Sequence, residues 1–266
     1  ARSTARQVIE LTDTMVMDWF QRWLWPFFRI LGLMMTAPIF GTRTVPAPTR
    51  VLTGAAIAAV LSPLLPGVDP IDPLSIPGTL VAAHQVVIGA ALGLALRLVF
   101  LTFEIAGQLI AQQMGLGFAA MVDPQTGSQV PVIAQFYVTM ATLLFLVLDG
   151  HLLAIEALAR SFDALPVGGG MIAADNLWAF FDWMGYLIGE AVRLALPVLT
   201  ALLIVNVGFG VMSRAAPQLN IFVVGFPVMM VAGLATMLVL FGRFPASFER
   251  LMSEGFVFIE QVLGGP

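Results

Sequence analysis

Apolar residues gather in six long blocks along this chain, with polar residues and prolines concentrated between them. The blocks cover residues 19–40, 51–65, 78–103, 132–158, 177–211 and 222–241. A helix needs about 20 apolar residues to cross the hydrocarbon core of a bilayer, and every block except the second reaches about that length. The pattern therefore predicts an all-α, polytopic, membrane-type protein.

Prolines and short links refine this prediction. A proline inside a helix removes a hydrogen bond and bends the helix, so Pro38, Pro197 and Pro227 predict kinked helices. The last two blocks are joined through Pro217 and Asn220, which favour a tight break between two helices. We expect these two blocks to form a helix hairpin.

Two pairs of glycines lie four residues apart, Gly89 with Gly93 and Gly185 with Gly189. This spacing lets helix backbones approach closely, although it also arises by chance in a glycine-rich apolar chain. Both pairs are expected to mark contacts between helices.

Composition supports a membrane protein. The chain has 59% hydrophobic and 11% charged residues, whereas a soluble domain has about 25% charged residues. The net charge is −4 and all twelve basic residues are arginine, so there is no basic face for nucleic acid. The absence of cysteine excludes disulfides, zinc–thiolate sites and iron–sulfur clusters. No secretory signal peptide is expected, since Glu10, Asp13 and Asp18 interrupt any apolar run near the start.

Several charged and polar side chains lie inside the apolar blocks. An arginine at the centre of a span costs about 2.5–3.5 kcal/mol on insertion scales. Arg29, Arg97 and Arg193 therefore either snorkel or pair within a helix bundle, or face protein in a larger assembly. Glu190 is one helical turn from Arg193 and can pair with it, whereas Glu104 is too far from Arg97 for such a pair. The candidates for buried polar or ion-pair positions are Arg97, Glu104, Asp149, His151, Glu190 and Arg193.

Groups suited to catalysis are few. The chain has two histidines, and Asp149 and His151, on either side of a glycine, are typical either of a base or metal ligand or of a turn at a helix end. A metal site needs three or four ligands, and no hydrolase, metalloprotease or P-loop motif occurs. We therefore expect no catalytic, cofactor or metal site.

Another class of function stays open at this point, a secondary transporter of ions or small solutes. Its coupling site would combine Arg97, Glu104, Asp149 and His151. A transporter of this kind would act without partner proteins. An intramembrane hydrolase is a third and more distant alternative.

Residues 112–136 differ from the blocks on either side, because they are almost uncharged but rich in glycine, proline and glutamine. Irregular backbone at membrane depth occurs only inside protein or against a water-filled cavity. The stretch therefore indicates a pore, a gate or a binding site. Met114 and Phe118 would share a helix face and suit either a soft seal or ordinary core contacts, and Asp123 with Pro124 favours a turn.

Four ordered segments resemble a known family. They are APIFGTRTVPAPTRV (37–51), GLGFAAMVDPQTGSQVPVIAQF (115–136), LFLVLDGHLLAIEAL (144–158) and PQLNIFVVGFP (217–227). These segments resemble the FliR/SctT family of type III secretion export gates, and the second and third resemble its flagellar members more than its virulence members. The resemblance covers nearly the whole chain. Pro48 departs from the family pattern, where an arginine or a similar residue is expected.

The resemblance implies a structural, pore-forming subunit without enzymatic activity, which passes unfolded rod, hook and filament subunits across the bacterial inner membrane. It implies a helical gate with several copies of FliP and FliQ in the flagellar basal body, with FlhB around it and FlhA below. Much of that assembly would stand above the bilayer plane. Residues 1–176, including the loop 112–136, would be FliP-like, and residues 177–266 would be a FliQ-like C-terminal helix hairpin and tail.

By the same resemblance, the loop between the third and fourth blocks plugs the central channel at rest and moves aside for substrate. By motif match the plug falls on residues 115–131. The residues expected in the plug or gate are Met114, Gly115, Gly117, Phe118, Met121, Asp123, Pro124, Gln125, Gly127, Gln129 and Pro131.

Overall fold

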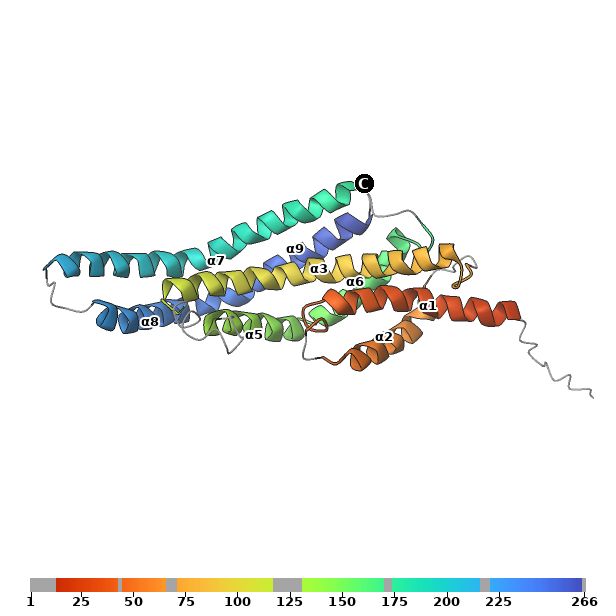
Figure 1. Cartoon of the computed structure of the whole chain (residues 1–266), viewed down its shortest axis with the longest axis horizontal. Helices are drawn as coiled ribbons and strands as arrows, with labels where there is room; N and C mark the ends of the chain where they lie inside the picture. The colour runs from red at the N-terminus through yellow and green to blue at the C-terminus, as the bar shows by residue number, and fades with distance from the viewer. Residues whose placement is uncertain are drawn as a thin grey trace, which may run out of the picture. The chain divides into compact units, whose positions relative to one another are not determined.

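The computed structural model describes residues 13–42, 45–65, 71–116, 131–169, 174–215 and 221–264, and every regular element among them is a helix (Figure 1). The all-α prediction is confirmed. The α-helices are α1 (Asp13–Thr36), α2 (Ala47–Leu61), α3 (Ile76–Gln113), α5 (Val132–Val147), α6 (Gly150–Ala164), α7 (Ala174–Ala215), α8 (Ile221–Leu240) and α9 (Phe244–Gly264). Two short 3-10 turns, η1 (Ser62–Leu64) and η3 (Phe241–Arg243), follow α2 and α8.

Four helical stretches in these ranges are long and apolar enough to cross a membrane. They are Ala47–Leu64, Ile76–Gln113, Asn176–Ala215 and Val224–Val262, and α5 with α6 makes a fifth if the bent pair is one span. The membrane-type prediction is confirmed. Helix α1 is not among the candidates, because Gln21, Arg22 and Arg29 interrupt its apolar sequence.

The apolar block at 132–158 forms two helices, and the turn at a helix end expected at Asp149 and His151 is confirmed. The chain bends by 68° between α5 and α6. Asp149 lies at the bend with φ +53°, a left-handed conformation that aspartate adopts more readily than most residues. Its carbonyl accepts two N–H groups from the first turn of α6, at 2.8 and 3.1 Å. Only glycine fits at position 150, since a Cβ there would lie 2.5 Å from the ring of Phe145.

Residues 244–264, expected only as a tail, form the helix α9. Its buried apolar residues recur at helical spacing, at Phe244, Phe248, Leu251, Met252, Phe258, Ile259 and Val262. Such a stripe is typical of a helix that packs along one face. This helix contains no uninterrupted apolar block, because Glu249, Arg250 and Glu254 occupy its other face.

The prolines fall differently from the prediction. Pro197 and Pro227 lie inside α7 and α8, whereas Pro38 lies beyond the end of α1. The prediction of a kink at Pro38 is therefore wrong. This proline follows the end of a helix, because a proline disfavours the helical conformation in the residue before it.

Contacts within the chain divide it into two compact units. The first is Ala1–Leu94 with Glu156–Ile172 and Leu263–Pro266, and the second is Ala95–Ile155 with Ala173–Val262. This division does not test the predicted FliP-like and FliQ-like parts, which concern likeness to other proteins.

In the first unit, α1 and the start of α3 meet along glycines, and we name this contact the α1–α3 seam. A Cβ on Gly89 would lie 1.8 Å from the carbonyl oxygen of Arg29, and one on Gly93 would lie 2.2 Å from Oγ1 of Thr36. The hydroxyl of Thr36 donates across the seam to the carbonyl of Ala90 at 2.9 Å. The contact predicted for Gly89 and Gly93 is confirmed.

Arg29 is fully buried beside this seam. Its Nε donates to Gln85 Oε1 at 2.7 Å, and its two Nη groups donate to the carbonyls of Ser161 and Leu165, also at 2.7 Å. The guanidinium also lies 3.8 Å from the centre of the Phe162 ring. Burial lowers the pKa of Arg29 to about 9, so the group keeps its charge at neutral pH. The carbonyl end of α6 thus supplies the negative potential that balances this cation.

The second unit is built around phenylalanines from α3, α5 and α9. Phe103 lies 5.0 Å from Phe244 between ring centres, and Phe100 meets Phe248 edge-on at 5.9 Å. Helix α7 runs antiparallel to α9, since Asn176 Nδ2, near the start of α7, donates to a carbonyl near the end of α9 at 2.7 Å. Helix α8 packs against α7.

Gly185 and Gly189, on α7, have no atom of the described chain within 4 Å of a Cβ placed on them. Within the described part of the chain this second glycine pair makes no helix contact, and a contact there with another protein stays a prediction.

Candidate functional site

The candidate gate region begins where α3 ends. The N–H of Leu116 donates to the carbonyl of Ala111 and the N–H of Gly115 donates to that of Gln112, both at 3.0 Å. This pair of bonds is the Schellman motif, which needs a left-handed residue at the position of Gly115. Gly115 has φ +83°, so this glycine closes α3 and fixes the direction in which the chain leaves it.

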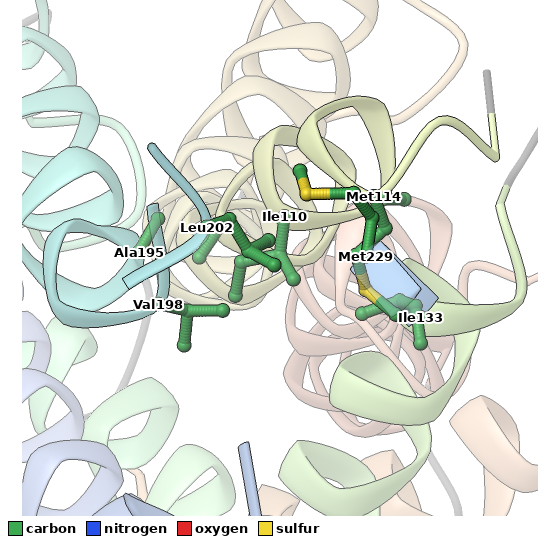
Figure 2. Close-up of a cluster of buried hydrophobic side chains, with 9 residues drawn as sticks. Ile110, Met114, Ile133, Ala195, Val198, Leu202 and Met229 are labelled. Carbon is green, nitrogen blue, oxygen red and sulfur yellow. The ribbon is translucent and has the colours of Figure 1, made fainter. Parts of the chain in front are cut away.

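Met114 holds this helix end in a hydrophobic cluster. The cluster contains Ile110 and Met114 from α3 and its end, Ile133 from α5, Val198 and Leu202 from α7, and Met229 from α8. Figure 2 shows Met114 and Met229 beside Ile133, with the α7 residues on the other side of Ile110. Met114 is 1% exposed, so within this chain it makes ordinary core contacts.

A notch in α8 receives the side chain of Met114. A Cβ on Gly233 would lie 2.8 Å from both Cγ and Sδ of Met114 and 2.9 Å from its Cε. Atoms this close exclude any side chain at position 233 unless Met114 moves. The Gly233 notch therefore sets how deeply Met114 enters the cluster.

The far end of the predicted loop returns to the same cluster. Pro131 precedes the first residue of α5, and its carbonyl accepts the N–H of Gln135 at 3.0 Å. Ile133 lies in the cluster, and a Cβ on Gly107 would lie 2.5 Å from Cα of Ala134. Both ends of the loop are thus packed against one buried base of α3, α5, α7 and α8, which we name the loop base.

Most predicted plug residues lie outside the described residues. These are Gly117, Phe118, Met121, Asp123, Pro124, Gln125, Gly127 and Gln129. The plug assignment itself therefore stays a prediction, and the structure adds the geometry of Met114, Gly115 and Pro131.

The four residues of the alternative coupling site lie on α3, at the bend between α5 and α6, and on α6. Arg97 and Asp149 are exposed, while Glu104 accepts a hydrogen bond from Gln108 at 3.2 Å. Nδ1 of His151 is buried without a hydrogen-bond partner among the described residues. No hydrogen bond or ion pair joins any two of these four side chains there. The described ranges also hold no group of three or more residues suited to a metal ion.

Glu190 and Arg193 form an ion pair at 2.5 Å. Glu190 is buried, but the side chain of Arg193 is 72% exposed. The other carboxylate oxygen of Glu190 accepts a hydrogen bond from Arg250 on α9 at 2.5 Å, and Arg250 also contacts Glu254 and the hydroxyl of Tyr186. Sequence reasoning missed Arg250 because it did not recognise α9, whose helical apolar spacing was the available signal.

Comparison with known proteins gives a consistent result. A sequence model of the bacterial export proteins, family 1, matches residues 20–255. The flagellar biosynthetic protein FliR of Pectobacterium carotovorum subsp. carotovorum is 39% identical over 93% of this chain and 95% of its own length. FliR of Escherichia coli (strain K12) is 34% identical over 96% and 98%, and FliR of Bacillus subtilis (strain 168) is 33% identical over 80% and 83%.

Proposed function

We propose a function on the premise that this chain belongs to the bacterial export proteins, family 1, and to the flagellar FliR members of that family. The chain acts as a structural, pore-forming subunit of the flagellar type III export gate. It passes unfolded rod, hook and filament subunits across the inner membrane. The loop at residues 115–131 plugs the channel at rest.

The single observation that carries this proposal is family membership over nearly the whole chain, together with relatives named for flagellar biosynthesis. The loop base supports the position of the plug. A loop that plugs a channel and moves aside needs two ends that stay in place. Both ends of this loop pack into one buried cluster. Motion of the plug then need not disturb α3 or α5.

The proposed partners are FliP and FliQ within the gate, with FlhB and FlhA beside it in the basal body. Residues 1–176 would stand in the assembly as a FliP-like part and residues 177–266 as a FliQ-like part. The exposed apolar side chains of α7 support a partner-covered or lipid-covered face, because Ile204, Val207 and Val211 are each more than 60% exposed. The chain carries out no enzymatic reaction in this proposal.

Native mass spectrometry of the tagged chain, co-expressed with FliP and FliQ, tests the proposal. A large hetero-oligomer that holds one copy of this chain is the expected result. A monomer or homodimer that binds neither FliP nor FliQ would overturn the proposal. That result would favour a transporter that acts without partner proteins. Uptake of solute into liposomes by the chain alone, abolished by His151→Ala, would establish that alternative.

A further inference from the structure

A small pocket of about 210 Å³ lies in the second unit between α5, α7, α8 and α9. Most of its lining is apolar, with Phe136 from α5, Pro197 from α7, and Met237, Leu240 and Phe241 from the end of α8 and η3. Phe136 and Phe241 remain 39% and 42% exposed. The pocket therefore continues onto an apolar surface that is open to the surroundings of the chain.

Among the described residues, the charged side chains that line this pocket are those of two arginines, Arg193 and Arg243. Arg193 gives one N–H to Glu190, and Glu190 shares its charge with Arg250. The side chain of Arg243 makes no hydrogen bond or ion pair with the part of the chain that the structure describes. Glu190 and Glu254 thus balance the charges of Arg193 and Arg250. The charge of Arg243 has no carboxylate partner among the described residues, which leaves one positive charge in excess at the pocket.

The surroundings of the two arginines indicate which class of anion the pocket would bind. Arg193 lies in the stretch Asn176–Ala215 and Arg243 in Val224–Val262, both apolar enough to cross a membrane. Guanidinium groups bind phosphate oxygens through paired N–H donors, and basic pockets between membrane helices hold phospholipid headgroups. A free anion would gain nothing from the apolar walls, whereas an acyl chain would bury them.

We propose that this pocket binds an anionic phospholipid, with Arg193 and Arg243 on the phosphate oxygens and an acyl chain along Phe136 and Phe241. This site is independent of the plug and of the export-gate role. Its positive charge disfavours phosphatidylcholine, whose choline group would approach the same guanidiniums. Phosphatidylglycerol is the matched anionic probe.

Native mass spectrometry of the full chain in detergent measures the occupancy of each lipid. Phosphatidylglycerol is expected to occupy the chain at lower concentration than phosphatidylcholine of the same acyl length. Arg243→Gln should raise the concentration for half-occupancy about fivefold, the effect of removing one basic group near a lipid phosphate. Arg97→Gln, an exposed arginine of the same unit outside the pocket, is the control and should leave the occupancy unchanged.

Four results would overturn the proposal. Equal binding of the two lipids would show that the pocket does not select an anionic headgroup. Equal effects of Arg243→Gln and Arg97→Gln would show that the lipid does not bind at this pocket. Displacement of phosphatidylglycerol by millimolar inorganic phosphate would assign the arginines to a free anion. Loss of lipid binding when FliP and FliQ are present would make the pocket part of a protein interface.

Discussion

Two sets of helix glycines in this chain meet very different surroundings. Along the α1–α3 seam, Gly89 and Gly93 lie against backbone and side-chain atoms so closely that no Cβ fits. Along α7, Gly185 and Gly189 have the same spacing but face no atom of the described chain within 4 Å. The same sequence pattern therefore marks one contact that the chain makes within itself and one surface that no described residue of the chain covers.

The largest expected effect is in the first unit, at Arg29. Arg29→Ala removes a buried cation and leaves Gln85 and the carbonyls of Ser161 and Leu165 without their donors. Breaking a buried charged network costs about 3–5 kcal/mol. Thermal unfolding of the purified chain should show this loss, while Arg97→Ala, an exposed control, should change stability by less than about 0.5 kcal/mol. Similar melting temperatures for the two variants would contradict the account of Arg29.

The glycine comparison itself is tested by two matched substitutions. Gly89→Ala forces a Cβ against the carbonyl oxygen of Arg29 and should destabilise the isolated chain by about 1–3 kcal/mol. Gly189→Ala meets open space and should stabilise it by about 0.5–1 kcal/mol, because alanine is the better helix former.

Co-purification with the companion proteins then shows what covers α7. If Gly189→Ala weakens assembly although it stabilises the isolated chain, protein covers this face. Unchanged assembly would indicate lipid there instead. A loss of stability in the isolated Gly189→Ala chain would contradict the open surroundings of this glycine.

A smaller effect is expected at the Gly233 notch. Gly233→Ala displaces the flexible end of Met114 and should cost about 1–2 kcal/mol. Because Met114 belongs to the loop base, the variant should also raise the ion leak of the assembled gate. Gly242→Ala, at a glycine with open surroundings, is the control. An ion leak equal to that of the control would show that the Gly233 notch does not influence the plug.

The smallest effect is expected at the α7–α9 ion network. Glu190 is buried, but the side chains of Arg193 and Arg250 are 72% and 47% exposed. Glu190→Gln should therefore cost about 1 kcal/mol, because water can solvate both arginines once the carboxylate is gone. Arg193→Gln should cost about 0.5 kcal/mol or less, as for an exposed pair. Equal losses in chemical denaturation would mean that Arg193 is more constrained than its exposure indicates.

The apolar pattern predicted the fold class and the approximate position of most helices, because burial and span length both appear directly in sequence. The polar residues Asp149 and His151 predicted a turn at a helix end. They did not predict the size of the bend, which depends on one left-handed residue and on the ring of Phe145 over position 150. The apolar pattern also did not predict α9, because charged residues on one face of this helix interrupt its apolar stripe in the sequence.

The candidate site was predictable in part. The glycine- and proline-rich composition located the loop at 112–136, but sequence alone did not separate the role of Gly115 as a helix cap from a role in the plug. The contact between Met114 and Gly233 joins residues far apart in the chain, so no local sequence pattern predicts it. The spacing of Glu190 and Arg193 along a helix predicted their ion pair. The second ion pair of Glu190, with Arg250, could not be predicted without recognising α9 as a helix.

The most direct test of the central claim is the ion conductance of the assembled gate in planar bilayers, with residues 122–129 deleted from this chain. The account predicts that the deleted complex still assembles, since the loop base retains both loop ends, and that it conducts well above the intact complex. Conductance at the background of the intact gate, in a complex of unchanged composition, would contradict the assignment of this loop as the plug.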